Sequence, residues 1–198
     1  MIVTCFTPGT RIETPQGPVP VQALAVDDLV LTRDHGAQPI RWIGRRDLTA
    51  DDLRARPQLV PVRISAGALG PGLPERDLVV SPQHRVLMGG WKAELLFGED
   101  EVLAAAQHLL GCPGIGRAAP GPVSYIHLMF DRHELVLSEG AWTESFQPGD
   151  HSLRGMDEAL RAELAALFPD LDVLGGGRAY PAVRRSLRAA ETRVLVSA

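Results

Sequence analysis

The sequence predicts a mainly β domain with a short helical appendage at its C-terminal end. From residue 10 to about residue 145, short runs with β-branched alternation are separated by Gly, Pro and Asp, which is typical of strands joined by turns. After Gly149 the apolar residues recur every three or four positions, which is the period of an amphipathic helix. We therefore assign residues 1–150 to a β domain and residues 151–198 to a helical C-terminal appendage.

The strands that we expect in the β domain follow from alternation between punctuating residues. We place them at Thr10–Thr14, Val19–Leu24, Leu29–Thr32, Ile40–Ile43, Val60–Ile64 and Tyr125–Phe130, with residues 15–18 as a hairpin turn between the first two. Residues 77–88 add a strand, a Ser-Pro break and a second strand with a histidine at its start.

Helices are expected at few places. Thr49 with the acids Asp51 and Asp52 after it predicts a capped helix start. Residues Glu99–Leu110 are rich in Ala and Leu and predict a second helix, whereas residues 111–122 are too rich in Gly and Pro for regular structure. In the appendage we expect helices over Ser152–Phe168 and over Pro181–Val194, which either pack on the β domain or connect it to a partner.

Composition limits the classes of protein that the chain can belong to. Its 198 residues suffice for one core, and 20 basic against 24 acidic residues give a net charge of −4, which argues against a nucleic-acid partner. No apolar run is long enough to span a membrane, and the first residues do not resemble a signal peptide. We expect a cytoplasmic location unless the domain is exported as part of a larger protein, and the oligomeric state stays open.

Two cysteines, Cys5 and Cys112, exclude a disulfide framework. A single bridge between them would block the Cys5 thiol, and we expect both thiols to be free. No pair of cysteines or histidines has the spacing of zinc ligands, so we expect neither a metal nor a cofactor.

The strongest chemical signal is the cysteine that opens the β domain, in Cys5-Phe6-Thr7-Pro8-Gly9-Thr10. A thiolate is the strongest nucleophile among ordinary side chains, and Cys5 directly follows the carbonyl of Thr4. Attack by its sulfur on that carbonyl would convert the Thr4–Cys5 peptide bond into a thioester. The chain is therefore a candidate for self-cleavage.

Further blocks make this hypothesis more specific. They are Gln38 to Gly44, Ala66 to Gly70, Ser81-Pro82-Gln83-His84-Arg85, Leu96 to Glu99, and a late block from Tyr125 to Gly140 that contains His127 and His133. In this order and spacing they resemble the Hint superfamily, which contains inteins and the autoprocessing domain of Hedgehog proteins, and within it a bacterial Hint-domain subfamily. The resemblance covers about residues 5–150. It implies a flattened horseshoe of bent antiparallel strands that brings the N-terminal nucleophile beside the central histidine block.

The resemblance also implies roles for particular residues. His84 would give a proton to the departing nitrogen of Cys5, as imidazole can near neutral pH. Ser81 matches the threonine of the Thr-x-x-His block in related domains and would bond the scissile amide or hold His84. An acid-base residue of the late block is either His127 or His133, and the sequence leaves both open.

One departure from splicing inteins restricts the reaction. Their last step needs an asparagine that cyclises, and this chain contains no asparagine. We therefore expect thioester formation and N-terminal cleavage without splicing, with an upstream polypeptide in cis, before Thr4, as the partner. Two alternatives stay open: a catalytically decayed Hint-fold scaffold or interaction module, and a cysteine hydrolase or transferase acting on an outside acyl substrate.

Overall fold

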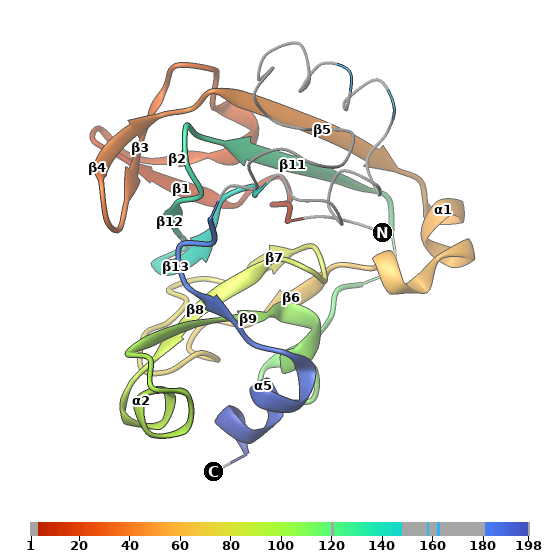
Figure 1. Ribbon diagram of the computed structural model, residues 1–198. Coiled ribbons are helices and arrows are strands. Elements are labelled where there is room, and N and C mark those ends of the chain that lie inside the picture. The colour runs from red at the N-terminus through yellow and green to blue at the C-terminus, as the bar shows by residue number, and fades with distance from the viewer. Residues whose placement is uncertain (1–3, 120, 148–157, 159–161, 163–180, 198) are drawn as a thin grey trace.

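The computed structural model describes residues 4–119, 121–147, 158, 162 and 181–197 (Figure 1). Strands dominate these residues, which confirms the mainly β prediction. The helix expected over Ser152–Phe168 lies outside the described residues, apart from Glu158 and Ala162.

Most strands belong to one large sheet. Its members are β1 (Arg11–Thr14), β2 (Gly17–Pro20), β3 (Leu29–Thr32), β4 (Gly36–Pro39), β8 (Arg85–Gly89), β9 (Glu101–Ala105), β12 (Leu135–Ser138), β13 (Ala141–Glu144) and β14 (Arg185–Ser186). The order is β14-β9-β8-β13-β12-β1-β2, and β3 pairs with both β12 and β4. All pairings are antiparallel except that of β14 with β9.

Two smaller sheets complete the β structure. One contains β6 (Val62–Ile64), β7 (Leu78–Val80) and β10 (Ile115–Arg117) in the order β10-β6-β7, and the other pairs β5 (Trp42–Leu48) with β11 (Val123–Met129). Phe6 forms antiparallel bridges with Val80 of β7 and with Ile126 of β11. The segment around Cys5 therefore joins the two small sheets and lies between them.

The helices are short and peripheral: α1 (Ala50–Ala55), α2 (Trp91–Phe97) and α5 (Ala189–Val196). The capped start predicted at Thr49 is confirmed, because its hydroxyl accepts from the Asp52 N–H at 3.1 Å while the Asp52 carboxylate accepts from the Thr49 N–H at 3.0 Å. Single 3₁₀ turns cover Val21–Ala23, Pro57–Leu59 and Ala106–Leu109. Among the described residues, no helix is long and apolar enough to cross a bilayer.

The helix predicted over Glu99–Leu110 is wrong. This segment forms strand β9 and then a 3₁₀ turn, because β9 pairs with β8 on one side and β14 on the other and buries Val102, Leu103 and Ala104 completely. Pairing inside a sheet overrides the helix propensity of Ala and Leu at these positions.

Other boundaries differ from the prediction. The strand expected over Val19–Leu24 ends at Pro20, strand β5 begins at Trp42 rather than at Ile40, and residues 111–122 contain the short strand β10. Helix α2 was not predicted.

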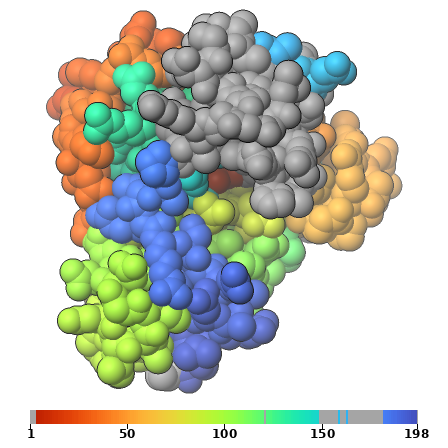
Figure 2. Space-filling view, viewed as in Figure 1, coloured from red at the N-terminus to blue at the C-terminus, as the bar shows by residue number. Residues whose placement is uncertain are grey.

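The last described segment differs most. The helix predicted from Pro181 begins only at Ala189, and Arg185–Ser186 before it pair with β9. Leu187 and Leu195 pack with Ala93 and Val102 in one apolar cluster. In Figure 2 this segment, in blue, runs across the face of the molecule beside the yellow-green atoms of α2. Residues 181–197 thus pack on the β structure.

Candidate functional site

Backbone hydrogen bonds fix the chain immediately after the peptide bond between Thr4 and Cys5. Phe6 and Ile126 exchange two N–H···O bonds, of 2.8 and 2.9 Å, and the Cys5 carbonyl accepts from the Ser81 N–H at 3.0 Å. The Cys5 side chain is 1% exposed. Neither Cys5 nor Cys112 is in a disulfide, and Cys5 is buried.

Ser81 lies next to both reactive atoms of Cys5. Its Oγ accepts from the Cys5 N–H at 3.0 Å, and its hydroxyl also forms a hydrogen bond with the thiol that lowers the pKa of Cys5. Burial acts the other way and is larger, so the pKa of the thiol is raised far above its ordinary value even though Ser81 and Arg46 both lower it. The resting site holds a thiol rather than a thiolate.

His127 lies on the carbonyl side of the same bond. Its Nδ1 is 2.8 Å from the Thr4 carbonyl oxygen. Because a carbonyl oxygen only accepts, Nδ1 carries the proton and donates it, which leaves Nε2 with a lone pair. The Cys5 sulfur is 3.5 Å from Nδ1 and 3.6 Å from Nε2. One imidazole therefore contacts the carbonyl oxygen and the sulfur.

Aromatic packing holds the His127 ring, which stacks on Trp42 with ring centroids 6.0 Å apart and meets the edge of Phe146 at 5.3 Å. Burial lowers the pKa of His127 to about 4, and the hydrogen bond to the Thr4 carbonyl offsets this only in part. The ring is neutral at pH 7.

His84 lies at the end of a tight turn in which its N–H donates to the Ser81 carbonyl at 3.0 Å. Its ring packs against Phe6, with centroids 4.5 Å apart. Burial lowers the pKa of His84 to about 4, against the opposing effects of the Glu144 carboxylate and the Cys5 backbone. Among the described residues, neither ring nitrogen has a partner at good hydrogen-bond geometry. The Cys5 N–H donates to Ser81 Oγ, which is one of the two contacts that the resemblance implies for Ser81.

His133 is buried at a second location. The Val183 N–H donates to its Nδ1 at 3.1 Å, and its Nε2 is 3.4 Å from Glu144 Oε2. Within the described part of the chain its contacts run to these residues rather than to Cys5. Of the two late histidines, His127 is the one that reaches the Thr4–Cys5 bond.

Sequence reasoning missed Glu144, which is 0% exposed. Its Oε1 accepts from the Thr4 hydroxyl at 2.7 Å and from the Arg85 N–H at 3.0 Å, and its Oε2 accepts from the Arg85 guanidinium at 2.8 Å. Burial raises the pKa of Glu144, but His133 and Arg85 outweigh it and the net shift is downward, so the side chain is a carboxylate at pH 7. The signal available in the sequence was an ionisable residue, Glu144, that follows Trp142 and Thr143 in a short run of strand-forming residues.

These residues form two groups around one peptide bond. We call Cys5, Ser81, His84 and His127 the cysteine site. We call Glu144, Arg85 and His133 the Glu144 cluster, which meets the cysteine site at Thr4.

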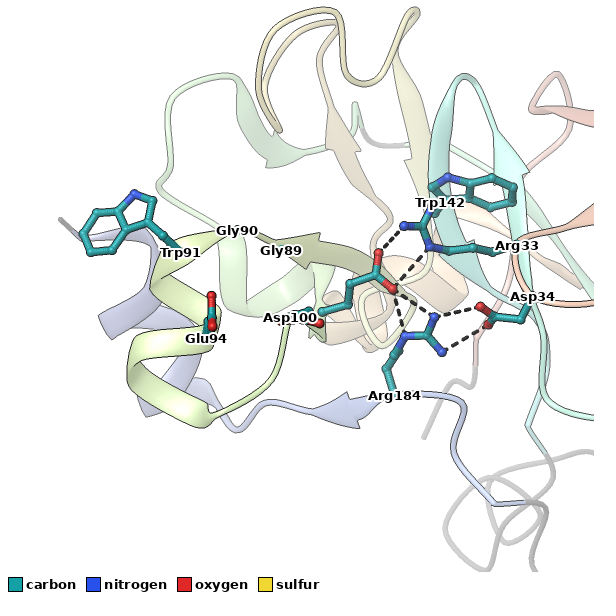
Figure 3. Close-up of a pocket in the computed structure, with 10 residues that line it drawn as sticks. Arg33, Asp34, Gly89, Gly90, Trp91, Glu94, Asp100, Trp142 and Arg184 are labelled. Atoms are coloured by element: carbon teal, nitrogen blue, oxygen red, sulfur yellow. Dashed lines mark hydrogen bonds and ion pairs between the residues drawn. The ribbon is translucent and has the colours of Figure 1, made fainter.

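A surface pocket lies elsewhere. It has a volume of about 790 Å³ and is lined by charged and indole side chains that include Arg33, Asp34, Glu101, Trp142 and Arg184 (Figure 3). Arg184 pairs with Asp34 at 2.8 Å and with Glu101 at 2.9 Å, so it ties the last described segment to the large sheet. None of the residues that the sequence singled out lines this pocket.

Several solved structures are similar to the chain. The gp41-1 intein is 12% identical, with 71% of this chain and 97% of that chain covered and a TM-score of 0.41. The MchDnaB-1 intein is 12% identical, with 71% and 98% covered and a TM-score of 0.43. The bacterial intein-like domain from Clostridium thermocellum is 13% identical, with 73% and 99% covered and a TM-score of 0.44.

No curated protein matches the chain. A protein-family model described as the Hint domain matches residues 4–150, which is most of the sequence. The chain therefore belongs to the Hint domain family.

Proposed function

We propose that this Hint domain cleaves the peptide bond between Thr4 and Cys5 of its own chain through an internal thioester, and that it does so without splicing. The observation that carries the proposal is the triple contact at this bond. His127 donates to the Thr4 carbonyl oxygen, the Cys5 sulfur lies beside the same imidazole, and Ser81 accepts from the Cys5 N–H.

The first step is an N-to-S acyl shift. The Cys5 sulfur attacks the Thr4 carbonyl carbon, and the electron pair moves to the carbonyl oxygen, where the His127 N–H stabilises the charge. The oxyanion then collapses, a C–S bond has formed, and the C–N bond breaks. Water or an added thiol attacks the resulting thioester and releases the upstream polypeptide, which is the partner in cis.

Protons balance inside the site. The shift takes one proton from the sulfur and adds one to the nitrogen. Ser81 bonds both groups, so its hydroxyl is placed to pass a proton from the thiol to the departing nitrogen. The Nε2 lone pair of His127, 3.6 Å from the sulfur, is a second acceptor for the thiol proton.

The remaining histidines take supporting roles in this proposal. The His84 ring has a pKa of about 4 and is neutral at pH 7, so it is a weak proton donor there and acts chiefly by packing against the Phe6 ring. His133 acts through Glu144 rather than on the bond. General acid-base assistance of the kind assigned to His127 is typically worth about 10²–10⁴-fold in rate.

A catalytically decayed scaffold is the second candidate function, and burial of the thiol favours it. A sulfur that is 1% exposed and whose pKa is raised gives little thiolate for attack. The same burial argues against a hydrolase for outside acyl substrates, which would have to reach that sulfur.

The test is a fusion with a folded passenger upstream of Thr4, incubated with dithiothreitol. We expect release of the passenger, loss of release in Cys5→Ala, and slower release in Ser81→Ala. Cys112→Ala is the matched control and should release at the unmodified rate, because Cys112 belongs to neither group around the bond. A fusion that stays intact through long incubation would support the scaffold instead.

A further inference from the structure

The residue before the nucleophile is held by its side chain as well as by its carbonyl. The Thr4 hydroxyl donates to Glu144 Oε1 at 2.7 Å, in a contact buried from solvent, and Thr4 itself is 7% exposed. The Thr4 side chain is thus buried against a charged partner.

We propose that Glu144 is a specificity-determining residue that recognises a hydroxyl on the side chain immediately before the cysteine. This inference rests on the proposed function, because it names the feature of the upstream polypeptide that the cleavage reaction selects.

The argument begins with the hydrogen bonds of the carboxylate. An ionised carboxylate is acceptor-only, with about four lone-pair sites. In Glu144 these face the Thr4 hydroxyl, the Arg85 N–H, the Arg85 guanidinium and, at the longer distance of 3.4 Å, His133 Nε2. A buried charge is tolerated only where such partners compensate it, so an apolar residue at position 4 leaves Glu144 short of one donor.

The Val183 N–H fixes the orientation of the His133 ring that faces Glu144. It donates to His133 Nδ1 at 3.1 Å, so in the neutral ring Nδ1 accepts and Nε2 carries the proton that faces Glu144. The last described segment thereby orients a positioning residue of the cluster.

Two contacts then orient one carbonyl group. The Thr4 hydroxyl is fixed by Glu144 and the Thr4 carbonyl oxygen is fixed by His127 at 2.8 Å. Loss of the first contact removes the anchor of the Thr4 side chain and leaves the carbonyl held by the His127 contact and by the bond from the Cys5 N–H to Ser81 Oγ. Because a displacement of about 1 Å can cost about 10²-fold in rate, loss of the hydroxyl should slow the acyl shift.

The experiment measures passenger release from six fusions. Residue 4 is Thr, Ser or Val (Thr4→Ser, Thr4→Val), each with Glu144 intact and with Glu144→Gln. With Glu144 intact we expect release from Thr and Ser precursors to be roughly tenfold or more faster than from the isosteric Val precursor. In Glu144→Gln the Thr-to-Val ratio should fall toward one, and Glu94→Gln, an exposed glutamate, should leave every rate unchanged.

A merely structural role for Glu144 predicts a different result, in which Glu144→Gln slows all three precursors by the same factor. Equal release rates from the unmodified precursor and from Thr4→Val, with Glu144 intact, would overturn the inference. This comparison does not need Glu144→Gln to fold.

Absence of release from all precursors would overturn the proposed function instead. The unfolding midpoints of the same six proteins would then decide the inference. Recognition requires Thr4→Val to lower the midpoint with Glu144 intact and to leave it unchanged in Glu144→Gln, and equal shifts in both backgrounds would overturn it.

Discussion

The two groups that meet at the Thr4–Cys5 bond differ in charge, although every member except the half-buried Arg85 is buried. The Glu144 cluster contains a carboxylate and a guanidinium 2.8 Å apart, and the carboxylate accepts three hydrogen bonds. The cysteine site contains a protonated thiol and two imidazoles whose pKa values lie at about 4. One group stabilises charge in the resting state and the other excludes it.

This difference assigns separate tasks to the two sides of the bond. A compensated ion pair gives fixed geometry here, because the carboxylate is held by three hydrogen bonds. Neutral imidazoles and a thiol in a dry environment can exchange protons, and a charge that develops there is sensitive to every nearby dipole. We infer that the Glu144 cluster positions Thr4 and that the cysteine site carries the chemistry.

Removal of the imidazole on the carbonyl gives the largest expected effect. We expect His127→Gln to slow passenger release by about 10²–10⁴-fold, because it removes the second acceptor for the thiol proton and the ring N–H that stabilises the charge on the Thr4 carbonyl oxygen. First-order release rates in dithiothreitol measure this. His133→Gln is the control from the Glu144 cluster and should have a much smaller effect; equal losses in the two variants would contradict the division of tasks.

Packing behind His127 provides the next test. A Cβ added at Gly44 would lie 2.1 Å from Cη2 of Trp42, the indole that stacks on His127. We expect Gly44→Ala to lower the free energy of unfolding by about 1–3 kcal/mol and to slow release as the indole shifts. Urea unfolding and release rates check both effects.

Gly116→Ala is the matched control, because nothing lies within 4 Å of a Cβ built there. If Gly44→Ala destabilises the fold without slowing release, then the indole does not position His127.

The pH dependence of stability separates the two groups. The pKa of His84 falls from an ordinary 6.5 to about 4 on folding, so at pH 5 the unfolded chain binds a proton there that the folded chain does not. Stability is therefore complete above pH 6.5 and is lost as the pH falls toward 4, by about 2 kcal/mol per such histidine at pH 5.

We expect His84→Gln to reduce the loss of stability between pH 7 and pH 5 by about 2 kcal/mol, as measured by urea unfolding at both pH values. Glu144 acts in the same direction but at lower pH: its pKa is lowered from an ordinary 4.5, so its contribution is fully present above that value and is lost only as the pH falls below it. An unchanged pH 5 loss in His84→Gln would show that this ring is not neutral in the folded protein.

The smallest expected effect concerns Arg46. Arg46 lowers the pKa of both Cys5 and His127. Arg46 on β5 lies opposite Tyr125 on β11, and Gly44 lies opposite His127. Because side chains two residues apart point to the same face of a strand, Arg46 and His127 share one face of the β5–β11 pair. We expect Arg46→Gln to slow release by up to about fivefold, as for a partly exposed charge interaction. The effect should shrink in high salt; a rate independent of both the substitution and salt would exclude the contribution.

Local signals in the sequence identified the elements whose structure is locally determined. The Thr49 cap and the Leu29–Thr32 strand match α1 and β3, because capping and alternation act within a few residues. The segment Glu99–Leu110 was mispredicted since its composition favours a helix, while the strands that pair with it, β8 and the distant β14, lie outside the segment. The parallel pairing of Arg185–Ser186 with β9 is equally non-local.

The site was predictable as a set of candidates but not as a geometry. The motifs pointed to Cys5, Ser81 and three histidines, yet the choice between His127 and His133 depends on the fold, in which β11 places His127 at the Thr4 carbonyl and His133 lies beyond the end of that strand. Glu144 was missed because its partners, Thr4 and Arg85, are 140 and 59 residues away in the chain. A buried ion cluster of this kind is visible only after folding.

The burial of Ser81 beside the Cys5 nitrogen has a consequence for the direction of the reaction. An acyl shift turns that nitrogen into a free amino group, whose ordinary pKa of about 7.7–8.0 falls when water is excluded. An uncharged amine next to the thioester would attack it and rebuild the original amide. In the enclosed site the amide and the thioester would thus interconvert. The rate of release would then depend on how readily an outside nucleophile enters.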